Sequence, residues 1–287
     1  MNRPIAFAVL LCFTGAVSAS DVDNVRAVQT KLKEDGFYSG EVDGAYSSQL
    51  SAALTRYQIR NGLPITGQLD VDTSKALGAE PAVTTRTQGR VAIDAAPASE
   101  TWRRLRKKDE EFLKNLDARG RAVAGTTKLK ADAANRTSQS TCAAAPPAES
   151  PTVGQVEPEP SDRESSSRIV ERLRDYVGAF VLAGLDPQVG AETDFFADQV
   201  RYYNEGVKDR QAIRRDLERY NARWPERKFW LDGDIAVTGE KDNLLRVTFP
   251  LRFELHNGKK KSAGKVEKTI VLETAGDDWQ IVAVNER

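Results

Sequence analysis

Apolar and polar positions follow different patterns in successive parts of the chain. From Asp21 to Gly78 apolar residues recur at helical spacing, whereas in the last third of the chain helical spacing gives way to strict alternation. Between these parts, residues 79–99 and 131–167 are rich in Ala and Pro and bury too little apolar surface to offset the entropy of ordering. The pattern predicts two folded domains joined by a linker at 79–167.

The first folded part contains a small internal repeat. Apolar spacing predicts a short amphipathic helix over 23–35, which Gly36 ends. A tight loop at 40–44 precedes a second predicted helix, for which Ser47 or Ser48 supplies the cap. The pattern Gly-x-Val/Leu-Asp followed by a helix occurs in that loop and again at 67–70, which indicates two related loop-helix units.

The last part begins with helices and ends in strands. Apolar spacing predicts a helix from Ile169 to about Gly184, and a helix over 210–224 that Pro225 stops. A strand is expected over 200–203, and later strands over 229–237, 244–255, 263–273 and 278–285. Helices first and a long meander last predict a curved antiparallel sheet wrapped on helices.

A charged segment within the linker also has an apolar stripe. Residues 100–121 predict a helix, and the stripe consists of Trp102, Leu105, Phe112, Leu113 and Leu116. Three roles are open for it: docking on a domain, pairing with another copy of the chain, or stiffening the linker.

The first nineteen residues have the order of a secretory signal. Arg3 is followed by the apolar run 5–13 and then by Val17-Ser18-Ala19, which is typical of a signal-peptidase site. The run is shorter than the roughly 20 residues that span a bilayer. We expect cleavage after Ala19, a periplasmic or secreted protein, and no transmembrane segment in the mature chain.

Composition excludes several classes of function. The 287 residues contain 42 Lys and Arg and 42 Asp and Glu, so a chain-wide basic field for nucleic acid is absent and no nucleic-acid partner is expected. His256, Cys12 and Cys142 are too few for a Cys/His zinc site or a Cys-His nucleophile pair, and we expect neither metal nor cofactor. Signal cleavage removes Cys12, so Cys142 is either a solvated linker thiol or an intermolecular disulfide.

The motif order of the first part resembles a small three-helix peptidoglycan-binding domain that is attached to many bacterial wall hydrolases. The resemblance covers Asp21 to Gly78, and the sequence departs from the family pattern at Ser47 and Leu50, in the region of the ligand groove. It rests on Val28-Gln29, Leu32, Gly36, Val42-Asp43-Gly44, Ala53, Tyr57-Gln58, Gly62-Leu63-Pro64, Thr66-Gly67, Leu69-Asp70, Thr73 and Ala76-Leu77.

The resemblance implies binding to peptidoglycan, and four side chains are candidates for it. Tyr38, Asp43, Tyr46 and Gln58 offer aromatic faces, a carboxylate or an amide to a glycan and its peptide. The alternative for Asp43, as for Asp70, is that it caps backbone amides. Asp21 to Gly78 alone is expected to sediment with purified peptidoglycan, in contrast to 168–287.

The last part resembles the nuclear-transport-factor-2-like (NTF2-like, or SnoaL-like) cone fold. The resemblance covers 168–287 and implies either a ligand cup or an enzyme such as a steroid isomerase or a dehydratase. It rests on Phe195-Phe196-Ala197-Asp198, Val200, Tyr202-Tyr203, Gly206, Ile213, Asp216, Tyr220, Trp224-Pro225, Arg227 and Trp279-Gln280-Ile281.

Five aromatic residues are candidates for lining a cup: Tyr202, Tyr203, Tyr220, Trp224 and Trp279. Tyr202 and Tyr203 are consecutive in a predicted strand, so we expect them on opposite faces, one in the core and one in the cup. The alternative is that all five fill the core.

Catalytic candidates are weak in this part. His256 directly precedes the hairpin turn Asn257-Gly258, which predicts a surface histidine. The carboxylates available to the interior have no recognisable partner; they are Asp194, Asp198, Glu205, Asp216 and Glu254. The polar face of 244–255 is a candidate surface for a homodimer.

Together these observations predict a multidomain chain. A small all-α peptidoglycan-binding domain and an α+β NTF2-like cone with a curved antiparallel sheet are joined by a largely disordered linker with a charged helix near 100–121. The favoured function is an exported, non-catalytic wall-binding protein whose cone binds a small ligand or a protein. The alternative is a wall-associated enzyme, either a hydrolase or an NTF2-fold isomerase or dehydratase.

Overall fold

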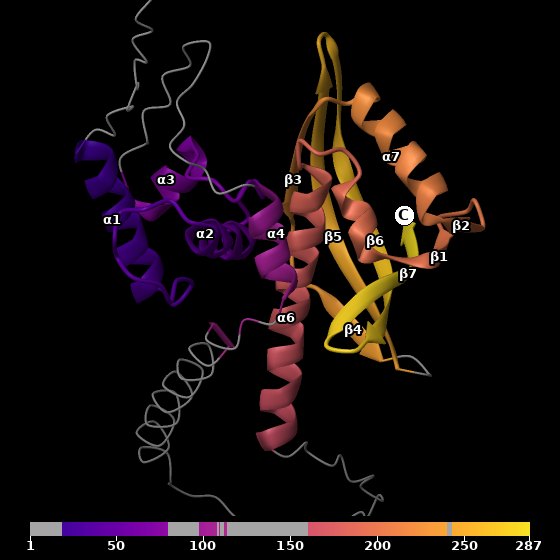
Figure 1. Cartoon of the computed structure of the whole chain (residues 1–287), viewed down its shortest axis with the longest axis horizontal. Coiled ribbons are helices and arrows are strands. Elements are labelled where there is room, and N and C mark those ends of the chain that lie inside the picture. Colours follow the sequence, from indigo (N-terminus) through magenta and orange to yellow (C-terminus); the bar gives the residue numbers. More distant parts are fainter. Residues whose placement is uncertain (1–18, 80–97, 108, 110–111, 114–159, 240–242) are drawn as a thin grey trace, which may run out of the picture.

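A computed structural model describes residues 19–79, 98–107, 109, 112–113, 160–239 and 243–287 (Figure 1). The predicted signal peptide up to residue 18, Cys142, and most of the predicted linker lie outside the described residues. None of the described helices is long and apolar enough to span a membrane. The described residues contain no group of three or more His, Cys, Asp or Glu side chains that could hold a metal ion.

The N-terminal domain consists of α1 (Ala19–Glu34), α2 (Ser48–Arg60) and α3 (Val71–Leu77). The two repeated units fold alike, because the Ser47 side chain accepts a hydrogen bond from Leu50 N at the start of α2, and Asp70 accepts one from Thr73 N at the start of α3. Gly78, at φ 68°, ends α3 in the left-handed conformation. The core of this domain is formed by Val25, Val28, Leu32, Tyr38, Leu50, Ala53, Leu54, Tyr57 and Leu77.

The C-terminal domain is an α+β fold around one curved sheet, as predicted from the sequence. The strand order is β2-β1-β7-β6-β5-β3, and β4 also pairs with β5. All pairs are antiparallel except β1 with β7, which the sequence pattern did not reveal. Its elements are α6 (Pro160–Gly184), η1 (Ala191–Phe195), β1 (Phe196–Tyr202), β2 (Val207–Asp209), α7 (Arg210–Arg223), β3 (Glu226–Leu231), β4 (Ala236–Gly239), β5 (Leu244–Asn257), β6 (Lys260–Ala275) and β7 (Asp278–Glu286).

The predicted strand over 229–237 is in fact two strands. β3 ends at Leu231 and β4 begins at Ala236, and the turn between them contains Gly233 at φ 150°. A positive φ of this kind suits glycine and interrupts a strand. Both strands pair with β5, which therefore forms the long centre of the sheet.

Besides its own core, the N-terminal domain contributes residues to the hydrophobic cluster of the C-terminal domain. The helix α4 (Ala98–Arg106), in the region of the predicted linker helix, lies between α2 and α6 and buries Trp102 and Leu105 there (Figure 1). Ile59 and Ile65 of the N-terminal domain belong to the same buried cluster as the inner side chains of the sheet. The described part of the predicted linker helix therefore docks between the two domains.

Close approach and polar contacts fix this junction. A Cβ atom at Gly178, in the middle of α6, would lie 2.6 Å from Ile59 Cδ1, so any side chain here would require the end of Ile59 to shift. The backbone N–H of Ile65 donates to Phe229 O at 2.8 Å, which joins the N-terminal domain to β3. Arg56 of α2 is buried in an ion pair with Asp175 of α6 (Nη2 to Oδ2, 2.8 Å).

Candidate functional site

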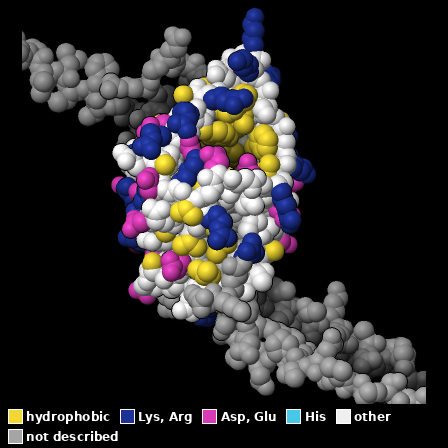
Figure 2. Space-filling view, turned by 90° about the vertical axis from the view of Figure 1, so that its right-hand side faces the viewer, with side chains coloured by type: hydrophobic (Ala, Val, Ile, Leu, Met, Phe, Trp, Pro, Cys, Tyr) yellow, Lys and Arg dark blue, Asp and Glu magenta, His cyan; other side chains and the backbone are white. Residues whose placement is uncertain are grey.

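The cone domain has an open cavity of about 800 Å³ between α6, α7, β1 and the concave face of the sheet. On the α7 side of the molecule, hydrophobic side chains gather in a hollow of the surface (Figure 2). Inward positions of β5 alternate with outward ones, which places Phe249, Leu251, Phe253 and Leu255 on the cavity wall. Further apolar wall comes from Phe180, Val181, Phe196, Leu217, Phe229 and Val266.

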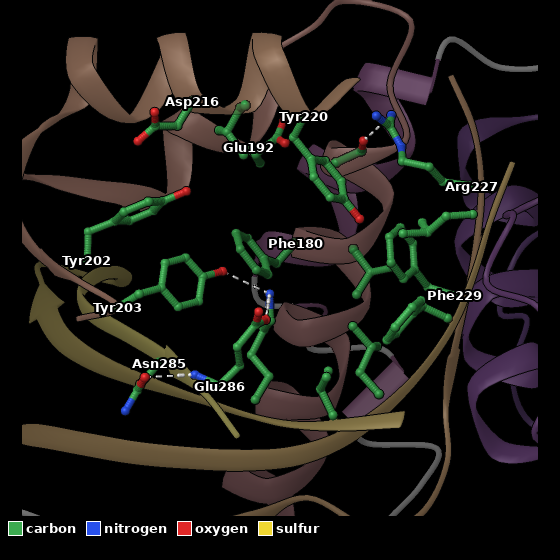
Figure 3. Close-up of a pocket in the computed structure, with 18 of the residues that line it drawn as sticks. Phe180, Glu192, Tyr202, Tyr203, Asp216, Tyr220, Arg227, Phe229, Asn285 and Glu286 are labelled. Carbon is green, nitrogen blue, oxygen red and sulfur yellow. Dashed lines mark hydrogen bonds and ion pairs between the residues drawn. The ribbon is translucent and has the colours of Figure 1, made fainter. Parts of the chain in front are cut away.

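Both tyrosines of the predicted strand line this cavity, so the expectation that they point to opposite faces is wrong (Figure 3). The reason is that β1 ends at Tyr202, and Tyr203 has a left-handed backbone with φ 49°. Their rings meet edge to face with centroids 4.6 Å apart. Burial raises the pKa of Tyr202, so this hydroxyl stays protonated and can donate a hydrogen bond.

One lysine lies among these aromatic groups with its partners already in place. Lys268 Nζ donates to Tyr203 Oη at 3.2 Å and lies 3.5 Å from Glu286 Oε2 (Figure 3). Burial disfavours the charge of Lys268, but Tyr203 and Glu286 outweigh it and raise the pKa. The cavity therefore contains a charged lysine that already forms one hydrogen bond and one ion pair.

A second polar pair in the cavity lacks partners. Glu192, on η1, is only 6% exposed, and its Oε2 is buried without a hydrogen bond. Arg227, on β3, donates from Nη2 to Gly184 O at 2.7 Å, but its buried Nε and Nη1 have no hydrogen-bond partner. A Cβ atom at Gly184 would lie 3.7 Å from Glu192 Oε1, so the Glu192 side chain also lies near the C-terminal end of α6.

Burial shifts the pKa values of both Glu192 and Arg227. Burial raises the pKa of Glu192, and the charge of Arg227 acts in the opposite direction. Burial lowers the pKa of Arg227, and Glu192 opposes that effect. The two groups attract each other but form no ion pair.

The other cup candidates lie at different places. Tyr220, on α7, lines the cavity close to Arg227 (Figure 3). Trp224 is the half-buried residue that ends α7, and Trp279 is buried against Tyr176 with its ring centroid 5.7 Å away. Neither tryptophan is among the residues that line the cavity.

Only some of the candidate carboxylates line the cavity. Glu205 and Asp216 line the cavity, and Lys208 Nζ lies 2.5 Å from a carboxylate oxygen of each. Asp194 and Asp198 are exposed. Glu192, which is the buried unpartnered carboxylate, was missed by the sequence analysis, because it stands in a short Gly-Ala-Glu-Thr-Asp segment with no periodicity.

A second hollow, the interdomain cleft, has a volume of about 780 Å³. It lies between the N-terminal domain, α4, the end of α6 and the neighbouring strands β3 and β5. Its lining residues include Tyr46, Ser51, Thr66, Gln68, Thr101, Arg227, Lys228, Glu254 and His256. His256, predicted at the surface, is half-buried on this wall.

The four candidates for wall binding have structural contacts in the N-terminal domain. Gln58 is fully buried, and its Oε1 accepts from Thr66 N at 3.0 Å and from Gly67 N at 2.9 Å. Tyr46 Oη donates to Gly67 O at 2.9 Å. Each of these contacts holds the loop before α3.

The other two candidates organise the loop before α2. Asp43 Oδ1 accepts from Ala45 N at 2.9 Å and from Gln29 Nε2 at 2.7 Å, and these hydrogen bonds lower the pKa of its carboxyl. Tyr38 is buried and donates from Oη to Glu41 O at 2.9 Å. Asp43 thus caps backbone amides, as does Asp70, and it is also exposed at the surface.

Residues 21–77 match the family described as "Putative peptidoglycan binding domain", which agrees with the resemblance found in the sequence. No curated protein matches the chain. The match defines the class of the N-terminal domain.

Three solved structures are similar to the C-terminal part. The first is a "Putative calcium/calmodulin dependent protein kinase II association domain" from Xanthomonas campestris (19% identity, 42% of this chain, 85% of that chain, TM-score 0.33). The second is ActVI-ORFA from Streptomyces coelicolor (14%, 40% and 92%, TM-score 0.35). The third is a "putative dehydratase from the NTF2-like family" from Streptomyces avermitilis (14%, 33% and 80%, TM-score 0.30).

Proposed function

We propose that the protein is an exported, non-catalytic protein that binds peptidoglycan through its N-terminal domain and a small ligand or a protein through its cone domain. The single observation that carries the wall-binding part is the family match over residues 21–77. The order of residues 1–19, typical of a cleaved signal, supports a periplasmic or secreted location at the wall.

The cone cavity supports the second part of the proposal. Ligand sites are concave, mostly apolar, and carry a few polar groups that fix orientation. The cavity has aromatic walls, a charged lysine, and two polar side chains, Glu192 and Arg227, that each have buried polar atoms without a hydrogen bond. Because the N-terminal domain contributes residues to the hydrophobic cluster of the cone domain, wall binding by one domain keeps this cavity at the wall.

Sedimentation of the full mature chain with purified sacculi tests the wall-binding part. We expect the chain to pellet with sacculi, to be released by soluble wall fragments, and to stay in the supernatant with cellulose, which is a polysaccharide without peptide. The variant Glu192→Leu serves as a matched control, since its change lies in the cone cavity and leaves the N-terminal domain intact. A chain that stays in the supernatant with sacculi refutes wall binding.

Glu192 also supports an enzyme as the second candidate function. A buried carboxyl with a raised pKa in a cavity has the properties of a general acid or base. Zymography on sacculi, and turnover assays on any ligand that binds the cone, test this candidate. Turnover that Glu192→Gln abolishes without lowering the melting temperature decides for the enzyme and against the non-catalytic protein.

A further inference from the structure

The end of α6 presents unused hydrogen-bonding groups of both kinds to the cone cavity. Arg227 has two buried N–H groups without acceptors, and Glu192 Oε2 is a buried acceptor without a donor. Both residues line the cavity, and in Figure 3 the Tyr220 ring lies between them. An unsatisfied buried polar group costs free energy, so a ligand that supplies both partners gains affinity here.

The requirement on the ligand is specific. Arg227 needs an oxygen acceptor, and Glu192 needs a donor when it is ionised. A protonated Glu192 still accepts an N–H at its carbonyl oxygen, so the same ligand suits either protonation state. A trans secondary amide is one planar group that offers a carbonyl oxygen on one side and an N–H on the opposite side.

The charged cavity residues other than Glu192 and Arg227 do not favour a ligand that is only an anion or only a cation. Lys268 is held by Glu286 and Tyr203, and Asp216 is held by Lys208. Neither pair therefore offers a free charge of its own to a ligand. The open partners are the N–H groups of Arg227 and the oxygen of Glu192.

We propose that the cone cavity binds a ligand with an amide group, whose carbonyl oxygen accepts from Arg227 and whose N–H donates to Glu192, and whose apolar body lies against the aromatic wall. This inference rests on the proposed role of the cavity as a ligand site. The wall around the amide position consists of Phe180, Phe196, Phe229 and Tyr220, which suits an aromatic or branched apolar body.

A matched pair of probes tests the proposal on the full mature chain. N-benzylacetamide and benzyl acetate have the same shape, but the ester replaces the N–H by oxygen. We titrate each probe into the protein and follow binding by ligand-observed NMR. The wild-type chain is expected to bind the amide about tenfold more tightly than the ester, which corresponds to about 1.4 kcal/mol.

Variants assign the two hydrogen bonds. Glu192→Leu removes the acceptor and is expected to abolish the difference between amide and ester, whereas Glu192→Gln keeps an acceptor oxygen and keeps the difference. Arg227→Met is expected to weaken both probes about tenfold, because both have the carbonyl. Lys228→Met is the matched control, since Lys228 lines the interdomain cleft and not the cone cavity; it leaves both affinities unchanged. Circular dichroism and melting temperatures verify that each variant is folded.

The outcomes separate this inference from the proposed function. Equal binding of amide and ester, a difference that persists in Glu192→Leu, or tighter binding of benzylammonium or phenylacetate refutes the amide site, while the cavity remains a ligand site. If none of the four probes binds, the amide site is refuted. Sedimentation with sacculi tests wall binding separately from either result.

Discussion

Replacing Arg56 with Met tests whether the two domains unfold as one unit. Both Nε and Nη2 of Arg56 contact Asp175 Oδ2, at 2.9 Å and 2.8 Å, and Nη2 also lies 3.0 Å from Asp109 Oδ2. The guanidinium lies 3.9 Å from the ring centroid of Phe112. The Arg56 side chain is 5% exposed, so these contacts are shielded from water in the folded wild-type protein.

We expect the loss of unfolding free energy that follows when one partner of a buried ion pair is removed. Removing one partner leaves the other charge buried and uncompensated, which costs about 3–5 kcal/mol of unfolding free energy. Burial already raises the pKa of Asp175, and Arg56 opposes this, so the variant raises that pKa further. A carboxyl whose pKa is higher in the folded than in the unfolded state stabilises the fold while it is protonated. For Asp175 this contribution is complete below the unfolded-state pKa of 3.8 and is lost as the pH rises through the folded-state pKa. The loss in the variant is therefore larger at pH 8 than at pH 5.

Arg60→Met is the matched control on the same helix. Arg60 lies one turn further along α2 and also forms an ion pair with α6, through Glu171, but its side chain is 28% exposed. Because this pair is more exposed than the Arg56–Asp175 pair, we expect its removal to cost less, about 1 kcal/mol. Guanidinium unfolding, followed by tryptophan fluorescence and by circular dichroism, is expected to show one shared transition that Arg56→Met shifts strongly and Arg60→Met shifts little. Equal shifts, or two separate transitions in the wild-type chain, refute the reasoning.

Four further predictions follow from particular residues. Gly178→Leu places a branched side chain against Ile59 and Thr55 and is expected to cost about 1–3 kcal/mol in guanidinium unfolding; no loss contradicts the close approach. Glu192→Gln is expected to raise the melting temperature at pH 8 and to change it little near pH 4, because a raised pKa in the folded state makes the ionised carboxyl destabilising; an opposite pH trend contradicts the assignment. Trp224→Ala is expected to cost about 1–2 kcal/mol, below the 3–5 kcal/mol typical of a buried Trp, because Trp224 is half-buried at the end of α7. Amino-terminal sequencing of the exported protein is expected to begin at Ser20; a mature chain that begins at Met1 contradicts export.

Periodicity predicted most of the fold because period and burial are directly linked. In β5 the inward residues Val247, Phe249 and Leu251 are buried, as the alternation predicts, and Ser47 caps α2 as the sequence indicates. The parallel pairing of β1 with β7 was not predictable, because the two strands are far apart in the sequence and no local pattern encodes their pairing.

The site was less predictable, because its chemistry depends on what surrounds each side chain. Tyr202, Tyr203 and Tyr220 were found by their size and amphipathic character, and all three line the cavity. Glu192 and Arg227 resemble ordinary surface residues in sequence. They become distinctive only because the end of α6 and the strand β3 bury their polar atoms without partners.

The contact between the two domains was also not predictable from the sequence. In the sequence, Ile59 and Ile65 are two more apolar residues of a small helical domain, and Trp102 belongs to a charged helix in a linker. In the structure, all three belong to the core that the N-terminal domain shares with the cone, and Arg56 completes the junction. A fragment that ends at Gly78 would expose these isoleucines and leave Arg56 without Asp175, so sedimentation of that fragment alone measures its folding together with its affinity. Wall binding is therefore measured on the full chain, where the surface of the N-terminal domain is presented on an intact core.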